Sequence, residues 1–239
     1  MRAFDVVVTD DGNGNALLTF AEGESLVLEG VTPTQINTAP QLYAAGIPCF
    51  TPGIRIATAR GLIPAEQIRV GDLRQTADNG LQPVIWTGAR DVGRAELSAC
   101  PALRPVLLQA GGLLGNACDS LVSPQHRFLV GHSAAGRALL GDEQFLRAKF
   151  MPELRRSRAR IAHGMDQVRY FHIMTEAHQV IFAEGVATET FWPGPQAVQG
   201  LMAADRRELY TLFPALRAVA AVPQPRRSRF VRAHYGHLA

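Results

Sequence analysis

The stretch that decides the fold is Pro-Cys-Phe-Thr-Pro-Gly at positions 48–53, taken together with Ser-Pro-Gln-His at positions 123–126. Cys49 directly follows a proline at the start of a β-rich region, and His126 ends a short turn that also carries the hydroxyl of Ser123. A cysteine in this position can attack the carbonyl of the preceding residue, because neighbouring residues lose no encounter entropy. A nearby histidine can protonate the leaving amide nitrogen. The pair predicts chemistry on the chain's own backbone, at the peptide bond that precedes Cys49.

Composition excludes several other classes. The chain has 239 residues and a net charge of +3 that comes almost wholly from arginine, since Lys149 is the only lysine. Arginines cluster at 155–160 and 226–232. Such runs are more often solvated surface than nucleic-acid contacts, so no nucleic-acid partner is expected.

The three cysteines, Cys49, Cys100 and Cys118, are too few for a disulfide framework, and no Cys/His cluster suggests a metal. No metal or other cofactor is therefore expected. The N-terminus reaches Asp5 before any apolar core of signal-peptide length, and no membrane span is visible. The expected location is the cytoplasm, or outside the cell by a route other than Sec.

The order of predicted elements favours an all-β protein. Short β-type runs are separated by glycine and proline, without alternating helices. They lie at 6–8, 17–20, 26–28, 55–58, 81–86, 106–108, 121–122, 128–130, 168–173 and 180–183. Two stretches look helical, 145–160 and 205–221, the second with Asp205 as its N-cap.

These patterns divide the chain into four parts. We expect an N-terminal β segment at 1–30, a connector at 31–48, a compact domain at 49–191, and a C-terminal helix with a basic tail at 192–239. In the first part, Asp10-Asp11-Gly12-Asn13-Gly14-Asn15 resembles a calcium loop, but it has too few carboxylates, and we interpret it as a tight turn.

Five motifs in order resemble the Hint family, the self-processing modules shared by hedgehog proteins and inteins, and in particular bacterial Hint-domain proteins. Cys49-Phe50 resembles the processing junction. The other matching stretches are Thr51-Pro52-Gly53-Ile54-Arg55-Ile56-Ala57-Thr58, Ile68-Arg69-Val70-Gly71-Asp72-Leu73, Val122-Ser123-Pro124-Gln125-His126, and Tyr170-Phe171-His172-Ile173 with the following 178–185. The resemblance implies a Hint fold, with short strands in a pseudo-two-fold arrangement, a small N-terminal β appendage and a C-terminal helix.

The resemblance also implies roles for particular residues. Cys49 is the implied nucleophile and Pro48 the acyl donor of the cleavage junction. His126 is the implied general acid, and Ser123 keeps the hydroxyl of the family's Thr-x-x-His block. His172 stands near the position where inteins often carry an aspartate. It therefore either polarises the thiol or orients His126, or it is a structural strand residue.

Departures from the family's motifs limit the reaction. Splicing inteins end in His-Asn, but Glu189-Thr190 stands at the matching positions here, so full splicing is not expected. Hedgehog modules carry an aspartate where this chain has Gly88, so sterol transfer is not supported. The expected reaction is single-turnover autoprocessing rather than multiple turnover. The chain's own N-terminal segment is the substrate, and water, a thiol or an amine is the acyl acceptor. The alternative is a non-catalytic binding module that keeps the Hint fold.

Overall fold

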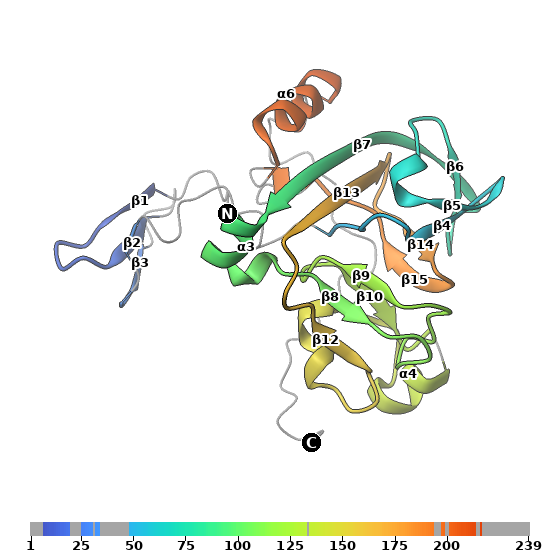
Figure 1. Ribbon diagram of the computed structural model, residues 1–239. Helices are drawn as coiled ribbons and strands as arrows, with labels where there is room; N and C mark the ends of the chain where they lie inside the picture. The colour runs from blue at the N-terminus through green and yellow to red at the C-terminus, as the bar shows by residue number, and fades with distance from the viewer. Residues whose placement is uncertain are drawn as a thin grey trace. The chain divides into compact units, whose positions relative to one another are not determined.

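The computed structural model describes residues 7–19, 25–30, 32–33, 48–132, 134–193, 197–198, 201–213 and 216 (Figure 1). The described residues up to 33 and from 193 onward belong to one compact unit, and residues 48–192 belong to a second. Most of the predicted connector at 31–48, and the basic tail, lie outside the described residues. The three predicted boundaries between these parts stay predictions.

Among its described residues, the first unit has three short strands and the helix α6. Strands β1 (Val7–Asp10), β2 (Ala16–Thr19) and β3 (Ser25–Leu28) form an antiparallel sheet in that order. Between β1 and β2, the Asp10 and Asp11 carboxylates accept hydrogen bonds from backbone N–H groups two and four residues further on. These bonds are those of a tight turn, as predicted.

Helix α6 (Ala203–Leu212) is the described helix of this unit. Its N-cap is Met202, and Asp205 lies in the first turn, so the prediction of Asp205 as the cap is wrong. An acidic residue in the first turn still favours the helix, because it faces the positive end of the helix dipole. Of the predicted span 205–221, residues 214–215 and 217–221 lie outside the described part of the chain.

The second unit is mostly β, which confirms the predicted fold class. Its strands are β4 (Arg55–Thr58), β5 (Gly61–Pro64), β6 (Leu73–Gln75), β7 (Leu81–Gly93), β8 (Val106–Leu108), β9 (Ser120–Val122), β10 (Arg127–Val130), β11 (Gln144–Arg147), β12 (Ala159–Ile161), β13 (Gln167–Thr175), β14 (Val180–Ala183) and β15 (Val186–Glu189). The helical pieces are η1 (Ala65–Gln67), α3 (Arg94–Ala99), η2 (Pro101–Leu103), α4 (Ala134–Leu140) and η3 (Ala148–Glu153). Within the described ranges, no helix is long and apolar enough to cross a membrane.

Two sheets organise this unit. Among the described residues, nine strands form the larger sheet, in the order β11-β10-β15-β14-β4-β6-β7-β13 with β5 paired to β4. Strands β12, β8 and β9 form the smaller one. Figure 1 shows β7 and β13 running side by side as the longest antiparallel pair, in which His172 lies opposite Gly88.

The core explains why some strands lack an alternating pattern. Every residue of β10 and of β15 is buried, because both strands lie inside the larger sheet with side chains covered on both faces. The main cluster joins residues from both sheets, including Phe50, Val122, Phe128 and Ile173. Phe50 thus anchors the segment after Cys49 in the core.

The predicted helix at 145–160 is wrong. The structure has strand β11, the short 3₁₀ helix η3 and strand β12 there. Pro152 interrupts regular α-helical bonding, and β11 and β12 find strand partners in β10 and β8.

Candidate active site

Phe50 holds the predicted junction between the two sheets. It forms isolated antiparallel bridges with Val122, at the end of β9, and with Phe171 on β13. Phe50 and Phe171 exchange both backbone hydrogen bonds, with N···O distances of 3.0 and 2.8 Å. Because the backbone is held on both sides, the Pro48–Cys49 peptide bond occupies a fixed position in the protein interior.

The nitrogen side of that peptide bond faces the turn at 123–126. The N–H of Cys49 donates to Ser123 Oγ over 3.0 Å, and the N–H of Ser123 donates to the Cys49 carbonyl over 3.1 Å. The N–H of His126 donates to the Ser123 carbonyl over 3.0 Å, which closes the turn. The structure thus brings Cys49, Ser123 and His126 together, although 74 positions separate Cys49 from Ser123.

His126 is completely buried between two aromatic rings. Its ring centre lies 4.5 Å from that of Phe50 and 4.9 Å from that of Phe128. Burial lowers the pKa of His126 to about 4, while Glu189 and the Cys49 backbone raise it and Arg127 lowers it further. His126 is therefore a neutral imidazole at neutral pH.

The two ring nitrogens of His126 have different surroundings. Nε2 lies 2.5 Å from Thr188 Oγ1. Nδ1 is buried and makes no hydrogen bond to any residue that the structure describes. The sequence did not single out Thr188; a hydroxyl residue in a continuously buried strand was the available signal.

His172 faces the carbonyl side of the junction. Its Nδ1 lies 3.5 Å from the Pro48 carbonyl oxygen, at the outer limit of a hydrogen bond. The ring is parallel to that of Trp86, with a 6.3 Å centre-to-centre distance and a 5° interplanar angle. Burial lowers the pKa of His172 to about 4, which the Pro48 carbonyl opposes and Arg90 reinforces. The structure thus places His172 beside the Pro48 carbonyl.

Tyr170 is a further buried polar residue near Cys49 that the sequence analysis missed. Its hydroxyl donates to the Leu103 carbonyl over 2.7 Å. Burial raises the pKa of Tyr170 well above its usual value, and Cys49 raises it further. Tyr170 and His172 are two positions apart on β13, so both side chains point to the same face of the strand. That alternation was the signal that could have found Tyr170.

Gly88 has no space for a side chain. A Cβ at this position would lie 2.3 Å from an atom of the Trp86 ring. The aspartate that hedgehog modules carry at the matching position would displace Trp86, and with it the ring that covers His172. A side chain at position 88 would therefore require Trp86 to move.

Glu189 is a buried carboxylate at the end of β15. It forms an ion pair with Arg127 and a hydrogen bond with His178, whose Nε2 lies 2.9 Å from Glu189 Oε2. These partners lower the pKa of Glu189 although its burial acts in the opposite direction. His178 is thus a structural partner of Glu189.

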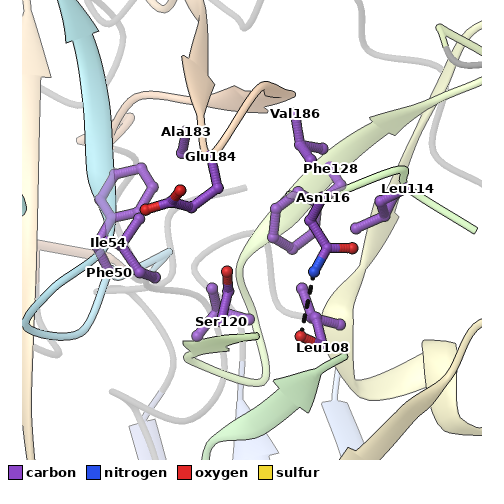
Figure 2. Close-up of a pocket in the computed structure, with 11 residues that line it drawn as sticks. Phe50, Ile54, Leu108, Leu114, Asn116, Ser120, Phe128, Ala183, Glu184 and Val186 are labelled. Carbon is purple, nitrogen blue, oxygen red and sulfur yellow. Dashed lines mark hydrogen bonds between the residues drawn. The ribbon is translucent and has the colours of Figure 1, made fainter. Parts of the chain in front are cut away.

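A small cavity lies beside Phe50, close to the junction (Figure 2). It has room for about one water molecule, and its walls are mostly apolar. Figure 2 shows the Asn116 side chain directed toward Leu108, whose carbonyl accepts its hydrogen bond over 3.2 Å. Cys49 is not part of the lining, so this cavity provides no substrate cleft for the thiol.

Comparison with known families gives the identity of this unit. A sequence profile for the Hint domain matches residues 48–195, which is more than half of the chain. The chain belongs to the Hint-domain family. The match begins at Pro48, and it includes Cys49, Ser123, His126 and His172.

Solved structures similar to this Hint domain include bacterial intein-like and intein domains. The intein-like domain from Clostridium thermocellum is 19% identical, with 59% of this chain and 96% of that chain covered and a TM-score of 0.35. A DnaB intein from Synechocystis sp. PCC 6803 is 11% identical, with 60% and 98% covered and a TM-score of 0.37. The gp41-1 intein is 12% identical, with 59% and 97% covered and a TM-score of 0.36. No curated protein sequence matched the chain.

Proposed function

We propose that this Hint domain forms a thioester at Pro48–Cys49 by an N-to-S acyl shift and then passes the acyl group to a small nucleophile. The substrate is the chain's own N-terminal segment. The acceptor is water, a thiol or an amine. Each chain reacts once, as in autoprocessing. The reaction does not include splicing.

The observation that carries this proposal is the set of contacts around one peptide bond. Ser123 Oγ accepts the hydrogen bond of its nitrogen, and His172 Nδ1 lies near its carbonyl oxygen. His126 is buried next to the same segment, with one ring nitrogen not hydrogen-bonded to any described residue. A peptide bond needs just these groups to rearrange: one that polarises its carbonyl, and one that delivers a proton to its nitrogen.

The rearrangement balances without any other reactant. Cys49 Sγ attacks the Pro48 carbonyl carbon, and its thiol proton passes to His126. The carbon–nitrogen bond breaks, and His126 returns the proton to the Cys49 nitrogen, which becomes an amine. In this step His172 stabilises the negative charge that develops on the Pro48 oxygen.

The second step depends on which nucleophile reaches the thioester. Water gives a carboxylic acid at Pro48, a thiol gives a new thioester, and an amine gives an amide. In each case the Cys49 thiol is released. Cys49 is completely buried, which favours small acceptors.

The region around Glu189 and Thr190 supports cleavage rather than splicing. Glu189 is held by an ion pair with Arg127 and a hydrogen bond with His178. Thr190 Oγ1 accepts the backbone N–H of Gln179 over 3.0 Å. Neither side chain has the amide nitrogen with which an asparagine would cyclise.

A non-catalytic binding module is the second candidate, and one observation favours it. Large apolar side chains are exposed on the strands and turn between β5 and β7: Leu62, Val70, Leu73 and Leu81. Exposed apolar side chains on neighbouring strands are a feature of interaction surfaces. This candidate predicts an intact chain under all conditions.

Hydroxylamine separates the two candidates. The wild-type chain is incubated with it and analysed by intact mass, beside Cys49→Ala and a Cys118→Ser control that removes a partly exposed thiol. We expect a hydroxamate on a fragment ending at Pro48 from the wild type and from Cys118→Ser. An unbroken wild-type chain would favour the binding module.

A further inference from the structure

The Thr188 hydroxyl lies against the imidazole of His126. Thr188 lies on β15 opposite Phe128 of β10, so the strand pairing places its side chain near His126, which directly precedes β10. The side chain is completely buried. Its hydroxyl donates to the Arg127 carbonyl over 2.8 Å.

A threonine hydroxyl has one proton, and a carbonyl oxygen can only accept. Once that proton is donated to Arg127, Thr188 Oγ1 can only accept from His126 Nε2, 2.5 Å away. Nε2 must therefore carry hydrogen. A neutral imidazole has one N–H group, so Nδ1 holds a lone pair.

The opposite tautomer would leave the buried Nε2 atom without a hydrogen-bond donor. An Nε2 lone pair would face a hydroxyl oxygen whose proton is already bound to Arg127. Buried donors and acceptors without partners are costly, so the pairing with Thr188 selects one tautomer.

We propose that Thr188 is a positioning residue that holds His126 as the Nε2–H tautomer, so that its Nδ1 lone pair takes the Cys49 thiol proton and returns it to the Cys49 nitrogen. This role rests on the proposed function. During the transfer His126 becomes an imidazolium with both nitrogens protonated, and Thr188 still accepts the Nε2–H. The proton leaves sulfur and reaches nitrogen by way of Nδ1.

The charged residues around His126 do not select the tautomer. Glu189 and Arg127 act on its charge in opposite directions, and each is paired with the other. Their effect is on protonation as a whole. The hydrogen bond from Nε2 is the contact that distinguishes the two neutral forms.

The test measures the tautomer directly by nitrogen-15 NMR of histidine in the full chain, in the Cys49→Ala background so that no chain cleaves. We expect a single Nε2–H form for His126. Adding Thr188→Val should give a mixture or the Nδ1–H form, and adding Thr188→Ser should restore the original signal. Thr175→Val removes another buried strand hydroxyl, which donates to the Ala177 carbonyl, and should leave the signal unchanged.

Cleavage rates in the Cys49-containing chain give an independent readout. We expect Thr188→Val to slow thioester formation about tenfold, because one hydrogen bond sets the tautomer population, and Thr188→Ser to recover most of it. An Nδ1–H form in the Cys49→Ala protein, or an unchanged tautomer on adding Thr188→Val, would overturn the proposal. If the tautomer behaves as expected but the wild type does not cleave, the autoprocessing function fails and the Thr188 contact stands. If Thr188→Val does not fold, the His126 tautomer in Cys49→Ala and in its Thr188→Ser derivative still tests the proposal. An Nδ1–H form in either protein would overturn it.

Discussion

Lowering the pH from 7 to 5 should destabilise this domain through two buried histidines. The pKa of His126 and of His172 is about 4 in the folded protein, because burial disfavours the charged ring. An unfolded histidine has a pKa of about 6.5. Between these values the unfolded chain binds protons that the folded chain does not, so stability falls as pH falls.

The size of the loss follows from those two pKa values. From pH 7 to pH 5, each histidine lowers the free energy of unfolding by about 2 kcal/mol, and the pair by about 4 kcal/mol. The loss begins near pH 6.5 and ends near pH 4. Most exposed carboxylates remain ionised across this window, so they contribute little to it.

Urea unfolding at several pH values measures this loss. The Cys49→Ala chain keeps a single covalent species during the measurement. In that background, His126→Gln should halve the pH dependence, and His172→Gln should do the same. Ser123→Ala removes a buried group that does not titrate, so it changes stability without changing the slope. A free energy of unfolding that stays level between pH 7 and pH 5 would refute the assignment of both histidines as buried neutral rings.

Three further substitutions test the surroundings of the site. Glu189→Gln leaves the buried guanidinium of Arg127 without its carboxylate and should lower the free energy of unfolding by about 3–5 kcal/mol, measured by urea. Arg74 is completely buried on β6 with no hydrogen bond to a described residue, and burial lowers its pKa to about 10. Because a buried guanidinium without a partner is costly, Arg74→Met should raise the free energy of unfolding by about 1–3 kcal/mol. A lower free energy of unfolding would indicate that the substitution had removed a partner. Gly88→Ala forces the Trp86 ring to move, and should lower the melting temperature and slow thioester formation together; unchanged values would show that the ring has other space.

The sequence predicted the centre of the site more fully than its surroundings. The motifs that contain Cys49, Ser123 and His126 indicated a meeting across more than 70 positions, and the structure places these residues together. Such motifs are informative because the order of blocks along the chain reflects one fold. The link between Thr188 and His126 depends on the register of β10 and β15, which composition does not reveal.

The missed strands and the wrong helix have a common cause. Short strands such as β5, β6 and β12 have three or four residues, too few for a periodic pattern to be distinguished from a turn. At 145–160, apolar residues that match a helical face are buried instead by strand pairing and a 3₁₀ turn. Tertiary contacts decided these segments, and local preference did not.

The acyl shift at Cys49 is the central claim, and intact mass after incubation with dithiothreitol tests it most directly. The account predicts two fragments from the wild type, one ending at Pro48 and carrying a dithiothreitol thioester or its hydrolysed acid, and one beginning with Cys49. Cys49→Ala should remain whole. A wild-type chain that stays unbroken, a break at another bond, or the same break in Cys49→Ala would contradict it.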